Sequence, residues 1–179
     1  SDYTRETKPD LILFHGDRVE ALSSAIVGAL SNILTGHIEG GELSGTIDES
    51  IRHATSKLSH VHFVANEEAK NRLVQLGELK KSIYVIGSPD MDLMSPNAIL
   101  PLDKVKSHYD LNYKNYAILM FHPVVSELDD ISNQIKTIVD SAIHSGLNYI
   151  VIYPNNDSGS DLIINEYKRL SGNPKFKVF

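Results

Sequence analysis

Four residues with polar or flexible character, His15, Gly16, Asp17 and Arg18, follow a short apolar run at residues 11–14. A carboxylate at the start of the next helical pattern gains from the helix dipole, so Asp17 can be a simple helix cap. Arg18 does not fit that interpretation, because the dipole disfavours a cation at a helix N-terminus. An arginine in this place instead indicates an anionic ligand. Both interpretations of Asp17 are open at this point.

A second polar segment, residues 37–42, combines one histidine and two glutamates with two glycines. His37 and Glu39 are two residues apart, which predicts that they lie on the same face of a strand. Glu39 and Glu42 flank Gly40 and Gly41. Carboxylates that are crowded together raise one another's pKa, which prepares one of them to hold a proton near neutral pH. The segment therefore predicts a general acid–base site.

The residues that follow, 44–49, begin a helical pattern. Ser44 or Thr46 can cap this helix, with Glu49 completing a capping box. Capping accounts for Thr46 and Glu49, but it leaves the two glycines and their flanking glutamates unexplained.

Two further polar segments lie in the second half of the chain. His122 stands before Pro123 at the end of an apolar run, where sites of α/β proteins lie, so we expect it to be a site residue. Residues 153–161 are rich in turn formers, among them Asn155, Asp157 and Gly159. These residues can form the turn and cap the next helix, or their amides can bind an anion or sugar hydroxyls.

The elements that must position these groups alternate along the chain. Short apolar runs predict strands, and a three- to four-residue periodicity predicts helices. The expected strands are residues 11–14, 33–38, 61–64, 82–86, 116–121 and 149–153, and the expected helices are 19–30, 47–58, 67–76, 131–143 and 160–170. In the second of these helices, Ile51, Ala54 and Leu58 are expected to form the inner face.

Strands that alternate with helices predict the α/β fold class, with Rossmann-like parallel sheets and helices on both faces. Ligands of such folds bind at the carboxyl edge of the sheet, where the polar segments above are expected to lie. Prolines punctuate the mostly polar residues 87–115, which predicts a connection between two domains at residues 1–95 and 96–179.

Composition removes several functional classes. The net charge is −6, the wrong sign for a protein that binds phosphate backbones, so nucleic acid is not an expected partner. The absence of cysteine excludes disulfides, thiolate metal sites and cysteine nucleophiles. No apolar run suits a membrane span, and residues 1–8 are polar and mixed in charge, unlike a signal peptide. We expect a cytoplasmic protein that does not bind membranes.

The segments at residues 15–18, 37–42, 44–60 and 87–89 resemble the hydrolysing branch of the UDP-N-acetylglucosamine 2-epimerases. The resemblance extends over residues 10–170 and rests most on residues 40–54, a block that is not a generic α/β pattern. It implies two Rossmann-like domains arranged as in glycosyltransferase-B folds, with the active site in the cleft between them. Family members are longer, so the chain is expected to be incomplete at both ends. The family also implies a homo-oligomer, a dimer or a tetramer.

The resemblance implies the reaction as well. UDP leaves C1 of a UDP-2-acetamido sugar as the C2 proton is removed, water then adds, and a free sugar of manno configuration results. The resemblance points to Asp17 and Glu39, with Asp48 and Glu49 near them, as acid and base, without dividing the roles. Arg18 and His122 are the candidates to stabilise the departing diphosphate. The candidate substrate-binding residues are Arg18, His37, Gly41, Glu42, Asn155, Asp157 and Gly159. This chemistry requires no cofactor and no metal.

Two other functional classes are open. His15, Asp17, His37 and Glu39 are ligand types that suit a divalent cation, as in a metal-dependent phosphoesterase. The other class is a non-catalytic domain that binds nucleotide sugars. Sensitivity to a chelator separates the phosphoesterase from the epimerase, and calorimetry with UDP tests the binding domain.

Overall fold

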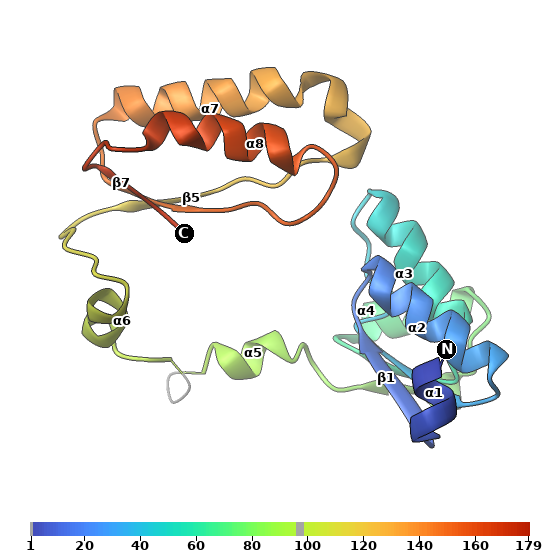
Figure 1. The fold of residues 1–179 in the computed structure, drawn as a ribbon. Coiled ribbons are helices and arrows are strands. Elements are labelled where there is room, and N and C mark those ends of the chain that lie inside the picture. The colour runs from blue at the N-terminus through green and yellow to red at the C-terminus, as the bar shows by residue number, and fades with distance from the viewer. Residues whose placement is uncertain (1, 96–98) are drawn as a thin grey trace. The chain divides into compact units, whose positions relative to one another are not determined.

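The computed structural model describes residues 2–95 and 99–179. The chain divides into two compact units, Ser1–Leu100 and Pro101–Phe179, each with its own parallel sheet (Figure 1). The predicted domain boundary between residues 95 and 96 touches residues 96–98, which lie outside the described residues. In the described part of the chain, no helix combines the length and the apolar character that a membrane crossing requires.

The first unit contains a four-stranded parallel sheet in the order β1-β2-β3-β4. Its strands are β1 (Leu11–His15), β2 (Leu34–Ile38), β3 (Val61–Val64) and β4 (Ile83–Val85). Its helices are α1 (Asp2–Thr7), α2 (Val19–Leu30), α3 (Ile47–Lys57), α4 (Glu67–Gln75) and α5 (Asp90–Leu93), with a 3-10 turn at Lys80–Ser82. Helices α2, α3 and α4 are the crossovers that parallel neighbouring strands need.

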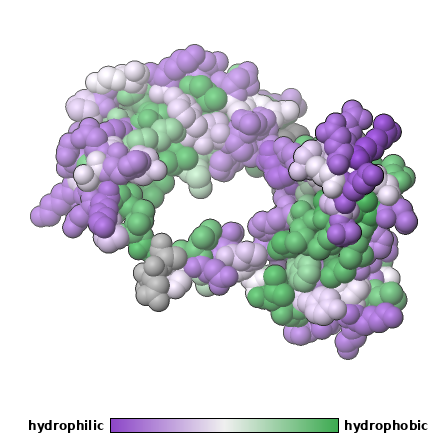
Figure 2. All heavy atoms as spheres, turned by 60° about the horizontal axis from the view of Figure 1, so that its bottom comes forward, coloured by the Kyte–Doolittle hydropathy of each residue, from purple (hydrophilic) through white to green (hydrophobic). Residues whose placement is uncertain are grey.

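The crossover helices of the first unit share one face of its sheet. Phe14, His37 and Ile83 lie on that face by strand register, and all three are buried. Residues on the opposite face, such as Leu13 and Tyr84, are exposed. Figure 2 shows hydrophobic surface on both units. Helices on both faces were expected, whereas in the described part of this unit the crossover helices cover one face.

The second unit contains a three-stranded parallel sheet in the order β5-β6-β7. Its strands are β5 (Ala117–Met120), β6 (Tyr149–Ile152) and β7 (Phe176–Val178). Its helices are α6 (Leu102–His108), α7 (Ile131–Ser145) and α8 (Ser160–Tyr167), with 3-10 turns at Val125–Asp130 and Lys168–Leu170. Helices α7 and α8 pack side by side over the sheet (Figure 1), and their core includes Ile135, Val139, Val151, Ile163 and Tyr167.

The register of the first sheet aligns the ends of its strands. His15 pairs with Ile38, and the Gly16 amide donates to the Ile38 carbonyl at 3.0 Å. The Glu39 amide donates to the Phe63 carbonyl at 2.8 Å. The polar segments that follow β1 and β2 therefore leave the sheet side by side at its carboxyl edge, as the α/β arrangement predicts.

Candidate active site

Glu39 is the first residue after β2, and its backbone is in the left-handed region, with φ at 65°. This conformation is uncommon for a residue with a side chain and is strained unless its surroundings hold it. The strand ends at Ile38, so Glu39 does not continue the alternation that placed it on the same face as His37. The two side chains consequently have different surroundings, although they are two residues apart.

Both carboxylate oxygens of Glu39 accept hydrogen bonds, one from the end of β1 and one from the loop after β4. His15 Nε2 donates to Oε2 at 2.6 Å, and the Ser88 hydroxyl donates to Oε1. Partial burial raises the pKa of Glu39, but the hydrogen bonds from Ser88 and His15 outweigh it, and the net pKa lies below that of an ordinary glutamate. Glu39 is therefore ionised at neutral pH and fixed in orientation.

Asp17 forms an ion pair with Arg52 of α3. The Asp17 side chain is 25% exposed and that of Arg52 is 10% exposed, so the pair is largely shielded from water. Arg52 Nη1 also donates to the Glu42 carbonyl at 2.9 Å, which ties α3 to the loops after β1 and β2. Arg18, not Asp17, occupies the N-cap position of α2, and the Arg18 side chain makes no capping hydrogen bond. The ion pair, rather than a capping role, therefore explains Asp17.

The inner face of α3 is polar rather than apolar. Its buried residues are Arg52, Thr55 and Ser56, whereas Ala54, one of the residues expected on the inner face, is exposed. The expectation was wrong for Ala54, because the sheet-side partners of α3 include the polar groups of Asp17 and His37. Leu58, the C-cap residue of α3, does pack on the core, against the cluster that contains Phe14. Sequence reasoning missed Arg52 and Ser56 as residues of this site. The available signal was a run of polar residues at helical spacing beside a block of acidic loop residues.

His37 has no exposed surface, and both of its ring nitrogens are used within the protein. Nε2 donates to the Gly16 carbonyl at 2.8 Å, and Nδ1 lies 2.9 Å from the Ser56 hydroxyl, which donates to it. Burial lowers the pKa of His37 to about 4, so the ring is neutral at physiological pH. His37 was expected to bind substrate, but in this structure it holds the turn that precedes Asp17.

Gly41 and Glu42 place the loop after β2 against helix α4. Gly41 has φ at 80°, and a Cβ atom there would lie 2.4 Å from the Ala69 carbonyl oxygen. Arg72 donates to the Gly41 carbonyl at 2.8 Å, and Asn66 Nδ2 lies 3.4 Å from a Glu42 carboxylate oxygen. Position 41 therefore requires glycine because the loop packs directly against the backbone of α4.

Glu49 and Asp48 stabilise the loop that leads into α3. A single carboxylate oxygen of Glu49 accepts the amides of Ser44 and Gly45, each at 2.9 Å. These two backbone hydrogen bonds lower the pKa of Glu49. The Thr46 hydroxyl donates to Asp48 at 3.1 Å, and Thr46 is the N-cap residue without a side-chain capping bond. The expected capping box is thus replaced by a carboxylate that binds two amides upstream of the cap.

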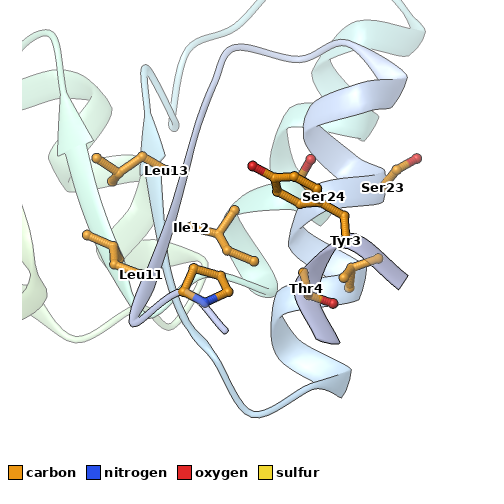
Figure 3. A pocket seen from close by; sticks show the side chains of 9 residues that line it. Tyr3, Thr4, Leu11, Ile12, Leu13, Ser23 and Ser24 are labelled. Atoms are coloured by element: carbon orange, nitrogen blue, oxygen red, sulfur yellow. The ribbon is translucent and has the colours of Figure 1, made fainter. Parts of the chain in front are cut away.

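Arg18 is exposed and lines a shallow hollow of about 390 Å³ together with His15 and Glu20. The hollow adjoins the hydrogen-bonded pair of His15 and Glu39. A second hollow, of about 470 Å³, follows β1 and α2 (Figure 3). None of the described residues that line it is charged, and its walls include Tyr3, Leu11, Ile12 and Ser24. Of the two hollows, the first is therefore the one that charged side chains line.

In the second unit, His122 follows β5 and is exposed. Its Nδ1 accepts the Asn155 amide at 3.0 Å, so a neutral ring carries its proton on Nε2. Asn155 Nδ2 donates to Asp157 at 2.5 Å, and Gly159, with φ at 94°, is the N-cap residue of α8. The structure thus brings His122, Asn155 and Asp157 together at the carboxyl edge of this unit's sheet.

These features define a class, that of Rossmann-like α/β proteins with ionisable groups where parallel strands end. A family model described as UDP-N-acetylglucosamine 2-epimerase matches residues 1–179, and the chain belongs to this family.

The relatives include enzymes that differ in their named substrates. A UDP-N-acetylglucosamine 2-epimerase from Neisseria meningitidis serogroup B is 51% identical over 174 residues, which are 97% of this chain and 46% of that protein. A UDP-N,N'-diacetylbacillosamine 2-epimerase (hydrolyzing) from Legionella pneumophila is 41% identical over 163 residues, which are 89% of this chain and 43% of that protein. The chain spans about half the length of the curated relatives it matches.

Solved structures of such epimerases resemble the fold. One from Neisseria meningitidis, bound to UDP-GlcNAc, has a TM-score of 0.76 at 22% identity and is matched over 99% of this chain and 51% of that one. Another, from Methanocaldococcus jannaschii in complex with UDP-GlcNAc and UDP, has a TM-score of 0.77 at 21% identity, over 99% of this chain and 51% of that one. This likeness confirms the predicted fold class, parallel α/β units of the glycosyltransferase-B-like epimerases.

Proposed function

We propose that this chain carries acid–base residues of a hydrolysing 2-epimerase that acts on UDP-N-acetylglucosamine or a UDP-diacetamido sugar. The observation that carries the proposal is the pair of carboxylates, Asp17 and Glu39, held at adjacent strand ends by Arg52, His15 and Ser88. The names of the Neisseria and Legionella relatives support this substrate class.

The proposed reaction proceeds through an unsaturated sugar. The C2 proton is not acidic, because no ring carbonyl is beside it, so its removal is coupled to departure of UDP from C1. The electrons of the C2–H bond form the C1–C2 double bond, and those of the C1–O bond leave with UDP. A proton then adds to C2 on the opposite face, and the hydroxyl of water adds to C1. The products are UDP and the free manno sugar.

One proton leaves C2 and another is added to C2 from the opposite face, so the reaction requires two groups on opposite faces of the sugar. We assign them to Asp17 and Glu39, and we propose that Glu39, which is ionised at neutral pH, removes the first proton. Asp48 and Glu49 are proposed to act near them, and the contacts of both residues hold the loop into α3. Arg18 and the Nε2 proton of His122 are the proposed donors to the departing diphosphate.

The remaining candidate residues are proposed either to bind the substrate or to hold the loops that position other groups. Asn155, Asp157 and Gly159 are proposed to bind the substrate, with Glu42 at the loop after β2. His37 and Gly41 act on substrate only through the loops that they hold. The proposed protein is a cytoplasmic homo-oligomer, a dimer or tetramer, whose partner molecule is the UDP-sugar.

Isotope incorporation by the full-length protein tests the proposal. In deuterated water with UDP-N-acetylglucosamine, we expect UDP and N-acetylmannosamine that carries deuterium at C2. Asp17→Asn and Glu39→Gln should each lower turnover by about 100-fold or more, since they remove acid–base groups. The control Asp103→Asn changes an acidic residue in the first turn of α6 and should leave turnover unchanged.

Product without deuterium at C2 contradicts the mechanism. Wild-type turnover by Asp17→Asn or by Glu39→Gln removes the substituted residue from the mechanism. A comparison of kcat/KM for UDP-N-acetylglucosamine and a UDP-diacetamido sugar then decides between the two substrates.

A further inference from the structure

Ser88 joins the loop after β4 to the loop after β2. Its hydroxyl donates to Glu39 Oε1, a contact between residues 49 positions apart. The Ile86 amide donates to the Val64 carbonyl at 2.9 Å, which attaches the start of this loop to β3. Gly87 then turns the chain with φ at 84°, and the proline at position 89 restricts the backbone of Ser88. The hydroxyl is thus presented to Glu39 by a constrained loop.

Two donors on two different oxygens fix the plane of a carboxylate. His15 alone would leave Glu39 able to rotate about its last side-chain bond, because that terminal torsion is broad. With Ser88 on the other oxygen, rotation of the carboxylate requires both hydrogen bonds to break. The strained backbone of Glu39 makes this support necessary, since its position is not fixed by a regular strand.

We propose that Ser88 is a positioning residue for Glu39, holding Oε1 so that the carboxylate faces C2 of the substrate in a fixed plane. The inference rests on the proposed function, in which Glu39 removes the C2 proton. A hydroxyl donor stabilises the ionised form of the carboxylate and not the protonated form. Loss of Ser88 therefore disturbs both the orientation of Glu39 and the pH at which it becomes a base.

The test compares Ser88→Ala with Ser88→Thr in the full-length protein. Hydrogen bonds to charged groups stabilise by about 1.5–3 kcal/mol, so Ser88→Ala should lower kcat by about 10- to 100-fold, with little change in KM. The acidic limb of the kcat profile should move to higher pH, because Glu39 loses a donor that favours its ionised form. Ser88→Thr keeps the hydroxyl and should restore both properties.

The matched control is Ser82→Ala. Ser82 also lies near β4, but its hydroxyl donates to the Leu79 carbonyl at 2.8 Å instead of to Glu39. It should keep the wild-type kcat and pH profile. If Ser88→Ala does not fold, Ser88→Cys replaces it, since a thiol is a similar volume and a weak donor. A wild-type kcat with an unmoved acidic limb in Ser88→Ala, or in Ser88→Cys where the alanine variant does not fold, overturns the proposal.

A direct titration separates this inference from the proposed function. The pKa of the Glu39 carboxyl is followed by ¹³C NMR in the wild type and in Ser88→Ala. A higher pKa in the variant supports the positioning contact even if the protein shows no epimerase activity. An unchanged pKa in an active epimerase overturns the role of Ser88 and leaves the proposed function standing.

Discussion

His37 is a neutral histidine enclosed by protein groups, and this has a consequence for stability. In an unfolded chain its pKa is 6.5, whereas burial lowers it to about 4 in the folded protein. Between these pH values the unfolded state binds more protons than the folded state. The contribution of neutral His37 to the free energy of unfolding is therefore fully present above pH 6.5 and is lost as the pH falls towards 4. We expect this residue to lower the free energy of unfolding by about 3 kcal/mol over that range.

Urea denaturation at a series of pH values measures the effect. His37→Gln should be less stable than the wild type at pH 7, because the hydrogen bonds to Gly16 and Ser56 are disturbed, but its stability should fall less steeply with acid. His144→Gln, a change at an exposed histidine, should retain the wild-type slope. An equally steep slope in His37→Gln would show that other groups cause the acid sensitivity.

Residue types and spacing predict where the polar groups gather, but not which of them face a ligand. Spacing places His37 and Glu39 on one strand face, and the structure separates them because β2 ends at Ile38. Ser88 stands out in the sequence only as part of a family motif, and its contact with Glu39 depends on a sheet register that spacing does not contain. Long-range partners of this kind follow from tertiary structure.

At the scale of elements, the loop between β2 and α3 depends on two glycines in left-handed conformations. Gly41 has φ at 80°, and a Cβ atom there would lie 2.4 Å from the backbone of α4, whereas Gly45 has φ at 69° and open space around it. Gly41→Ala should therefore lower the free energy of unfolding by about 3 kcal/mol, through strain and overlap together. Gly45→Ala should cost about 1 kcal/mol, through backbone strain alone.

Chemical denaturation of the two variants provides the measurement, and turnover provides a second one. Gly41→Ala should also reduce turnover, because the loop must move away from α4 and takes Glu42 and the Arg52 contact with it. Gly45→Ala should remain active. Equal losses of stability in both variants would mean that the approach to α4 contributes nothing.

Regular elements are predicted well where apolar periodicity is strong. Strands β1 to β6 and helices α2, α3, α4, α7 and α8 all lie at the segments that periodicity indicates. Periodicity misses the short helices α1, α5 and α6, the last two in a segment interpreted as an irregular connection. Neither α5 nor α6 buries a residue, so neither has the apolar stripe on which such predictions depend.

At the scale of the whole molecule, the same histidine and carboxylate side chains could serve a metal-dependent phosphoesterase or an epimerase. The contacts of these side chains favour the epimerase. A metal-dependent phosphoesterase needs His15, Asp17, His37 and Glu39 to offer lone pairs to a cation. In the structure, His37 Nε2 donates its proton to the Gly16 carbonyl, and Asp17 is paired with Arg52. Glu39 accepts from His15 and Ser88. Each group is thus already bound to a protein partner.

We therefore expect turnover of UDP-N-acetylglucosamine by the full-length protein to be unchanged by EDTA. A cation could bind these groups only after the Asp17–Arg52 pair and the Glu39 hydrogen bonds had broken, which would leave a shielded arginine without its partner. Activity is measured after dialysis against EDTA, with and without added Mg²⁺ or Mn²⁺. Loss of activity that either ion restores would replace the proton-transfer mechanism with a metal-assisted one, and would require these side chains to rearrange when the ion binds.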